Sequence, residues 1–263
     1  MGKPKIDKNA KTIEIKGNSK KEFFLIHGYT GSPTDFNQLG KYLNKRFDAN
    51  VKIIRLKGHG EKIKNIDKLT YEDFLYQCEK ELKKEIRKGR EIIIGGISIG
   101  SFIALQLSTK YNVKGVICIS LPYKTTLFAG IITFLEPIIL KKHWRKPISD
   151  YEKELSKNAF YYDINIKGLK IVKNGKKIIK RYLHKVTSPC LIIHVEKDKV
   201  FTKKSAFIIN EKISSKNKKI LIFDKEGNTH HNPFYSKNHE DLYKIIGDFV
   251  YKNKLFKKGN RKI

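Results

Sequence analysis

The fold is decided by residues 91–100, which read Glu91-Ile92-Ile93-Ile94-Gly95-Gly96-Ile97-Ser98-Ile99-Gly100. An apolar segment typical of a buried strand leads directly into Gly-x-Ser-x-Gly, and residues 101–107 continue as an apolar helix. A strand-to-helix turn this tight leaves no room for side chains at the flanking positions, which explains glycine at 96 and 100. The strained turn raises the Ser98 hydroxyl above the carboxyl end of the sheet. The stretch therefore predicts a nucleophile elbow.

A serine hydroxyl is a poor nucleophile at neutral pH, so Ser98 needs a base that is oriented by a carboxylate. Two later apolar strands end at candidates for these roles. Asp198 follows the first strand, and the pair His230 and His231 follows the second. Because catalytic groups gather at the carboxyl edge of a parallel sheet, we expect Ser98, Asp198 and one of the two histidines to meet there.

The acid and the base each have an alternative. Glu196 lies two residues before Asp198, but it falls nearer the strand end, where we expect it to be solvated. The usual position of the acid in the triad loop favours Asp198. His230 and His231 are adjacent and cannot both point at Ser98. Spacing alone leaves that choice open.

A serine nucleophile of this kind also needs two backbone N–H groups that face the developing oxyanion. Ile99 follows the nucleophile at a helix N-terminus, where N–H groups have no intrahelical partner. The second N–H is expected from Tyr29, in the loop that follows the strand at residues 23–26. His27 opens the same loop, and we expect it to order the loop by hydrogen bonds rather than to act as a second base.

Four segments together carry a family resemblance: residues 27–33, 39–43, 57–60 and 96–100. In this pattern the chain resembles the small bacterial carboxylesterases related to monoacylglycerol lipases, within the α/β-hydrolase superfamily. The resemblance covers about residues 20–121 and 187–252. It implies an α/β-hydrolase fold, a mostly parallel sheet flanked by helices with a small helical lid. It also implies a serine carboxylesterase that hydrolyses short- to medium-chain acyl esters, monoacylglycerols among them, with no cofactor and no metal.

The resemblance also bears on the base, because family members carry Ser or Thr two residues before the catalytic histidine. Thr229 stands two residues before His231, which favours His231. The chain departs from the family at His230, where a small residue is usual, and at Ile99, where Met is common. It departs again in residues 122–186, which do not align. We therefore expect a core of residues 1–121 and 187–263, with residues 122–186 as a helical lid.

The same triad could serve other reactions, because the fold fixes the nucleophile but not the leaving group. The alternatives are a lysophospholipase or thioesterase of the same fold, or a hydrolase-fold protein that binds a ligand without catalysis. The intact set of Ser98, Asp198 and histidine favours an enzyme over a binding protein.

The composition is strongly basic, with 56 Lys and Arg against 26 Asp and Glu and a formal net charge of +30. The lysines are spread along the whole chain, and no arginine-rich arm, zinc-finger spacing or RNA-binding aromatic motif accompanies them. Nucleic acid is therefore not an expected partner. A small-molecule ester or lipid is the expected substrate, with weak attraction to an anionic membrane surface.

The three cysteines, Cys78, Cys118 and Cys190, are expected to be buried and reduced, since their number is odd and two lie in apolar strands. The amino terminus is charged and lacks the apolar run of a signal peptide. These features predict a cytoplasmic protein.

The rest of the chain alternates strands and helices, as a mostly parallel sheet requires. The expected strands are an edge strand at 11–16 and buried strands at 23–26, 51–56, 91–95, 113–120, 190–195 and 219–223. Helices are expected near 35–46, 70–88 and 240–251, with Thr70 and Asp73 as a capping box and Asn238 as an N-cap. The apolar segment at 128–140 is expected to line an acyl-chain pocket, with Trp144, Tyr161 and Tyr162 as further candidates.

Overall fold

The computed structural model describes residues 6–127, 143–145, 163–224 and 231–256. Seven strands form one sheet in the order β1-β3-β2-β4-β5-β8-β9. The strands are β1 (Ile13–Ile15), β2 (Lys21–Ile26), β3 (Asn50–Ile54), β4 (Glu91–Ile97), β5 (Gly115–Ile119), β8 (Cys190–Val195) and β9 (Lys218–Phe223). Only β1 runs antiparallel to its neighbour within this sheet, so the predicted mostly parallel sheet is confirmed.

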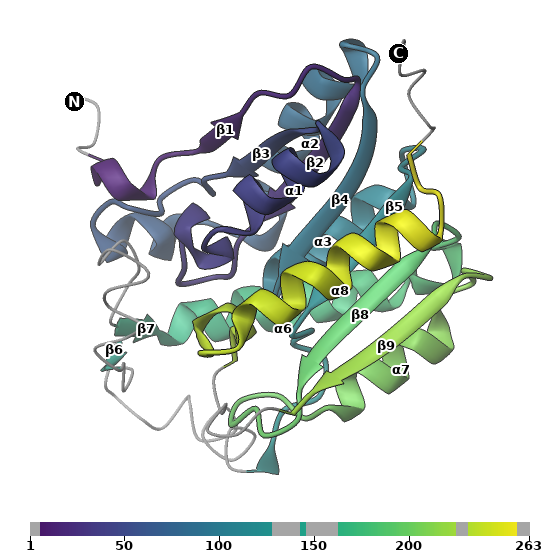
Figure 1. The fold of residues 1–263 in the computed structure, drawn as a ribbon. Coiled ribbons are helices and arrows are strands. Elements are labelled where there is room, and N and C mark those ends of the chain that lie inside the picture. Colours follow the sequence, from purple (N-terminus) through teal and green to yellow (C-terminus); the bar gives the residue numbers. More distant parts are fainter. Residues whose placement is uncertain (1–5, 128–142, 146–162, 225–230, 257–263) are drawn as a thin grey trace, which may run out of the picture.

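Helices cover both faces of the sheet (Figure 1). One face carries α1 (Leu39–Phe47) and α8 (His239–Lys252), and the other carries α2 (Tyr71–Arg87), α3 (Ile99–Ser108), α6 (Ile166–Lys180) and α7 (Lys204–Lys212). Within the described ranges, five short 3-10 helices connect the elements: η1 (Lys8–Ala10), η2 (Pro33–Phe36), η3 (Ile63–Lys68), η4 (Leu183–Lys185) and η5 (Pro233–Tyr235). A separate two-stranded ribbon joins β6 (His143–Arg145) and β7 (Asp163–Asn165).

The core consists of two apolar clusters, one on each face of the sheet. Successive side chains of a strand point to opposite faces, so β2 contributes to both clusters. Phe23 and Leu25 pack with α1 and α8, while Phe24 and Ile26 pack with α2 and α3. Burying each such side chain is worth about 1.5–3 kcal/mol, which is why the apolar strands define the fold.

The strands and helices lie close to their expected positions. β8 has the expected limits, α8 begins at His239 directly after Asn238, and the edge strand is shorter than expected. The capping box of α2 is confirmed: Asp73 N donates to Thr70 Oγ1 at 3.2 Å, and Thr70 N donates to Asp73 Oδ2 at 2.8 Å. The apolar segment at 128–140 lies outside the described residues, as do Tyr161 and Tyr162.

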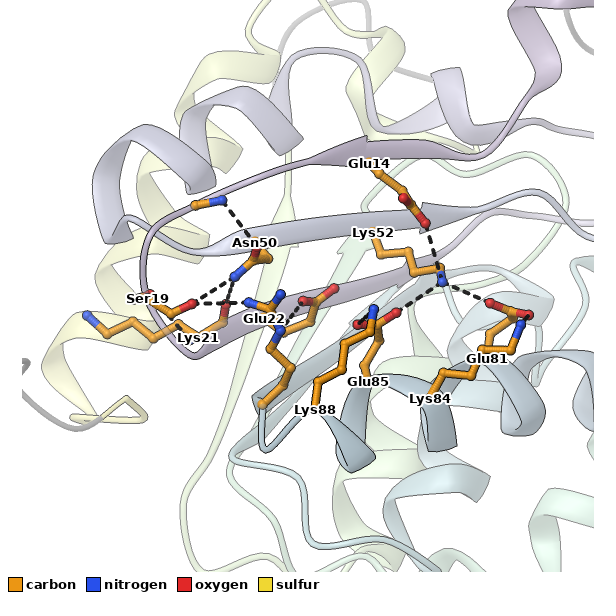
Figure 2. A network of polar contacts seen from close by, with 12 residues as sticks. Glu14, Ser19, Lys21, Glu22, Asn50, Lys52, Glu81, Lys84, Glu85 and Lys88 are labelled. Atoms are coloured by element: carbon orange, nitrogen blue, oxygen red, sulfur yellow. Dashed lines mark hydrogen bonds and ion pairs between the residues drawn. The ribbon is translucent and has the colours of Figure 1, made fainter.

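A charged cluster lies toward the amino ends of β2, β3 and β4 (Figure 2). Lys52 of β3 is 8% exposed, and its Nζ lies 2.8 Å from Glu81, 3.1 Å from Glu85 and 3.4 Å from Glu14. Burial lowers the pKa of Lys52, but hydrogen bonds to Glu81 and Glu85 outweigh it, so the pKa lies above its ordinary value. Lys52 is therefore held charged between β3 and α2.

Candidate active site

Ser98 occupies the turn between β4 and α3 with backbone angles φ 55° and ψ −120°. The glycines predicted to relieve this turn do so. A Cβ atom at Gly96 would overlap the carbonyl group of Gly100, and one at Gly100 would overlap the carbonyl oxygen of Ile26. Ser98 N donates to Ile119 O at 2.8 Å, which ties the turn to β5. A strained residue of this kind costs about 1–3 kcal/mol and persists only because its surroundings fix it.

Asp198 and His231 are brought together from the ends of β8 and β9. His231 Nδ1 lies 2.6 Å from Asp198 Oδ2 and donates to it, which leaves the lone pair of a neutral ring on Nε2. Asp198 Oδ1 accepts hydrogen bonds from the N–H groups of Val200 at 2.8 Å and Phe201 at 3.1 Å. The Asp198 carboxylate thus orients the His231 ring with one oxygen and is fixed by backbone N–H groups of its own loop through the other.

His231 Nε2 is buried and has no hydrogen-bond partner within the described ranges. The hydrogen bond between this nitrogen and Ser98 Oγ is therefore not formed in this structure. Ser98 itself is 8% exposed. Hydrogen bonds of catalytic groups are often long without substrate and tighten in the complex. The side chain of His231 is thus partly exposed, while its Nε2 atom is buried with its acceptor lone pair unused.

The electrostatics of Asp198 favour the charged form. Burial raises the pKa of this carboxyl, but the charge and hydrogen bond of His231 and the N–H groups of Val200 and Phe201 lower it further, so the pKa lies below its ordinary value. Asp198 is consequently ionised throughout the neutral range and can stabilise an imidazolium on His231.

The alternative acid and base have different positions. Glu196 forms an ion pair with Lys203 at the surface, whereas the carboxylate bonded to His231 is Asp198. His230 lies outside the described residues. In the described part of the chain, Asp198 and His231 are the carboxylate and histidine that meet at the carboxyl edge.

The loop expected from the sequence to bind the oxyanion, residues 27–32, begins where β2 ends and is called the oxyanion loop below. Ile26 lies opposite Gly96 in the parallel register, so the loop starts beside the elbow. A Cβ atom placed on Gly28 would lie 3.5 Å from Ser98 Cβ. The first residues of the loop therefore pass within van der Waals reach of Ser98.

His27 orders this loop, as expected from the sequence. Its Nδ1 donates to Gly28 O at 2.7 Å, and its Nε2 accepts from Leu56 N at 3.0 Å. Burial, with a smaller contribution from His59, holds the pKa of His27 well below its ordinary value. Both ring nitrogens are occupied and the ring is neutral, so His27 is a structural residue here.

His59 holds the next peptide of the loop, a role that the sequence did not reveal. Its Nε2 donates to Tyr29 O, and burial lowers its pKa to about 4. Its ring packs edge-on against His27, with centroids 4.7 Å apart. The only sequence signal was its place in the segment at residues 57–60, so its contact with Tyr29, thirty residues earlier in the chain, could not be read locally.

His194 is a second residue missed from the sequence. It interrupts the apolar run of β8, is fully buried, and its Nε2 donates to Phe201 O at 3.1 Å. The same nitrogen lies 3.7 Å from Asp198 Oδ2. Burial lowers the pKa of His194, so it braces the loop of Asp198 as a neutral ring.

The described residues contain no group of three His, Cys, Asp or Glu side chains placed to hold a metal ion. The cysteines Cys78, Cys118 and Cys190 are free and buried, as expected. Of the helices in the described ranges, none has the length and apolar character needed to cross a membrane.

Known proteins with similar sequences are lipolytic enzymes. A carboxylesterase of Bacillus subtilis is 22% identical over 245 residues, which cover 90% of this chain and 96% of that protein. A thermostable monoacylglycerol lipase of a Bacillus species is 25% identical over 198 residues, covering 75% of this chain and 78% of that protein. No family model matches the chain.

Solved structures show the same fold. A metagenome-derived lipolytic enzyme superposes with a TM-score of 0.82 at 19% identity, covering 94% of this chain and 100% of that one. A monoacylglycerol lipase of Paleococcus ferrophilus superposes with a TM-score of 0.72 at 14% identity, covering 92% of this chain and 98% of that one. The chain thus has the α/β-hydrolase fold and resembles carboxylesterases and monoacylglycerol lipases.

Proposed function

We propose that the protein is a serine carboxylesterase that hydrolyses short- to medium-chain acyl esters, monoacylglycerols included. The observation that carries the proposal is the pair formed by Asp198 and His231, with Nδ1 and Oδ2 2.6 Å apart and Nε2 left without a partner among the described residues. Similarity to a carboxylesterase and a monoacylglycerol lipase supports the reaction class. The strained elbow at Ser98 supplies the nucleophile.

In the proposed mechanism, Ser98 Oγ attacks the ester carbonyl carbon while His231 Nε2 takes the hydroxyl proton. The tetrahedral intermediate collapses, and His231 returns the proton to the departing alcohol, which leaves an acyl-enzyme on Ser98. A water molecule then attacks the acyl carbon with His231 as base, releasing the acid and restoring the serine. Asp198 keeps the proton on Nδ1 throughout and stabilises the imidazolium.

The oxyanion is proposed to bind the N–H groups of Tyr29 and Ile99. In a planar trans peptide, the C=O and the following N–H point in opposite directions. Because His27 and Gly31 N both donate to Gly28 O, at 2.7 Å and 3.2 Å, the N–H of Tyr29 is directed away from them. Ile99 lies at the first position of α3, where an N–H has no intrahelical acceptor.

Residues 122–186 are proposed to form a helical lid on the core of residues 1–121 and 187–263. The supporting contact is at the start of α6, where a Cβ atom on Gly168 would overlap the ring of Tyr29. The inserted segment therefore reaches the oxyanion loop directly. Further along α6, Ile171 and Ile179 pack into the core beside α3. This position allows the insertion to limit the length of the acyl chain.

We also propose a cytoplasmic location and weak attraction to anionic lipid surfaces. The three buried free thiols fit a reducing compartment. The net charge of +30 favours anionic surfaces, and salt screens such attraction over about 10 Å at 0.1 M. Co-sedimentation with phosphatidylglycerol vesicles that weakens as NaCl rises would support the attraction, and salt-independent binding would contradict it.

The reaction is tested by turnover of p-nitrophenyl esters from short to long acyl chains. Ser98→Ala is expected to lower kcat by about 10⁴-fold or more. The matched control is Ser108→Ala, which removes another buried serine hydroxyl of α3, bonded to Leu105 O at 2.7 Å. The control should retain activity. If the wild type turns over no ester and Ser98 is not labelled by a fluorophosphonate, the proposal is wrong and a binding protein of this fold is favoured.

A further inference from the structure

Asp35 is a buried carboxylate that the mechanism does not use. It lies on η2 and is 5% exposed. Its Oδ1 accepts a hydrogen bond from the hydroxyl of Tyr235 at 2.7 Å. Its Oδ2 lies against Gly31, where a Cβ atom would overlap that oxygen. The carboxylate therefore touches the oxyanion loop with one oxygen and η5 with the other.

The backbone of Asp35 makes a further contact. Its carbonyl oxygen accepts from Asn232 Nδ2 at 3.0 Å, and Asn232 directly follows His231. Asn232 Oδ1 in turn accepts from Phe234 N at 3.1 Å. We define residues 231–235 as the histidine loop. Asp35 is thus bonded to this loop at two points, through its side chain and through its backbone.

The sheet itself does not hold the two loops together. The oxyanion loop leaves β2 and the histidine loop leaves β9, and β4, β5 and β8 lie between these strands. The rings of Phe36 and Phe234 pack with centroids 6.0 Å apart beside Asp35. The contact between η2 and η5 therefore joins the oxyanion loop at Gly31 to the histidine loop at Asn232 and Tyr235.

Burying the Asp35 carboxylate between the two loops carries a desolvation penalty. Burying a charged or polar group is unfavourable unless hydrogen bonds compensate, and an apolar side chain often packs there at least as well. Core packing alone thus does not explain a carboxylate at position 35. A carboxylate at this position is explained by its two oxygens, one of which lies against Gly31 while the other binds Tyr235.

We propose that Asp35 is a positioning residue that fixes the oxyanion loop relative to the histidine loop, an inference that rests on the proposed esterase function. Through Gly31 it sets the place of the Tyr29 N–H, and through Asn232 and Tyr235 it sets the place of His231. Both groups act only when the oxyanion and the imidazolium form. Asp35 therefore acts on kcat rather than on substrate binding.

The test compares Asp35→Asn and Tyr235→Phe with Tyr71→Phe. The hydroxyl of Tyr71 is also buried and bonded to a side-chain oxygen, but this oxygen, Gln106 Oε1 at 2.9 Å, belongs to α3 rather than to either loop. Each variant is titrated with a fluorophosphonate to count active sites, and kcat and KM are measured per active site. Small displacements of catalytic groups cost up to about 100-fold. We expect Asp35→Asn to lower kcat by about 10- to 100-fold and Tyr235→Phe by a smaller factor, with KM nearly unchanged.

Two results would overturn the proposal. One is a loss of activity in Asp35→Asn that disappears when kcat is expressed per titrated site, which would mark a purely structural residue. The other is additive effects of Asp35→Asn and Tyr235→Phe in the double variant, because residues in one bridge must be coupled. If Asp35→Asn does not fold, Tyr235→Phe against Tyr71→Phe decides the question with the same measurements.

Failure of the esterase proposal can be separated from failure of this one. If the wild type neither hydrolyses esters nor reacts with a fluorophosphonate, the esterase proposal fails. The bridge is then tested by NMR of the His231 imidazole. Tyr235→Phe should shift its nitrogen and proton resonances, and Tyr71→Phe should not. Unchanged His231 resonances in both variants would refute the bridge.

Discussion

The parallel strands have two ends, here called the amino edge and the carboxyl edge of the sheet, and polar groups play different roles at each. Lys52, in the middle of β3, has Glu14, Glu81 and Glu85 around its Nζ, on the side of the sheet toward the amino ends of the parallel strands (Figure 2). At the carboxyl ends lie buried polar atoms without partners in the described ranges, among them Ser120 Oγ and His231 Nε2. Ser98 and Ser120 also have positive φ angles there. Lys52 near the amino edge is paired with three carboxylates, whereas the carboxyl edge combines the strained turn at Ser98 with these unpaired polar atoms that chemistry can use.

The comparison predicts that changes at the carboxyl edge reduce activity far more than stability. The largest effect is expected from Asp198→Asn, because the amide no longer enforces the proton on Nδ1 of His231. We expect kcat to fall by about 10⁴-fold, measured with a p-nitrophenyl ester and referred to folded protein by circular dichroism.

Glu196→Gln is the matched control, since it neutralises the neighbouring carboxylate, whose ion pair with Lys203 lies at the surface. Surface pairs contribute about 0–1 kcal/mol, so this variant should keep wild-type kcat and stability. A large loss of kcat in Glu196→Gln together with an active Asp198→Asn would show that Glu196 is the acid.

At the amino edge the expected effect is reversed. Lys52→Met removes the central cation and leaves Glu81 and Glu85 close together without it. Because Glu81 keeps Lys84 and Glu85 keeps Lys88 as ion-pair partners, the loss of unfolding free energy should be smaller than the about 3–5 kcal/mol expected for an uncompensated buried charge. Urea unfolding should show this loss, while kcat per folded molecule stays unchanged because the site lies at the other edge. Equal losses in kcat and stability would contradict the division between the two edges.

The sequence predicted the parts of this comparison that depend on local pattern. The apolar run of β8 and the glycines of the elbow are local signals, because burial and turn sterics act on neighbouring residues. The convergence of strand ends in a parallel sheet predicted Asp198 and one histidine of the pair, and the family resemblance favoured His231. His59 and Asp35 were missed as site residues, and Lys52 was read as part of a buried strand. Their partners lie far away in the chain, and such contacts have no periodicity.

The pH dependence of stability offers a smaller test of the amino edge. Burial, reinforced by Glu85, raises the pKa of Glu22 from 4.5 to about 7, against the opposing charges of Arg90, Lys52 and Lys88. The folded state therefore binds more protons than the unfolded state between these two pH values. The stability due to this group is complete below about pH 4.5 and is lost as pH rises through 7.

Glu22→Gln stays uncharged and should lack this contribution to the pH dependence. Between pH 5 and pH 8 we expect Glu22 to account for a loss of up to about 3 kcal/mol in the wild type, at 1.36 kcal/mol for each pKa unit. Urea unfolding of both proteins across this range measures the difference. If the unfolding free energies of the two proteins change with pH in the same way, Glu22 is ionised in the folded state. The charge of Arg90 would then offset the effect of burial on Glu22.

The smallest expected effect concerns α2, which follows β3 and precedes β4 and so runs from the carboxyl edge to the amino edge. Thr70 and Asp73 cap its N-terminus, and its later turns carry Glu81 and Glu85. Thr70→Ala removes the capping oxygen and should cost about 1 kcal/mol in urea unfolding. Since the cap is exposed and contacts no site residue, kcat should not change. A much larger loss of stability, with reduced activity, would contradict this expectation. It would mean that α2 couples the two edges of the sheet, so that they unfold and function as one cooperative unit.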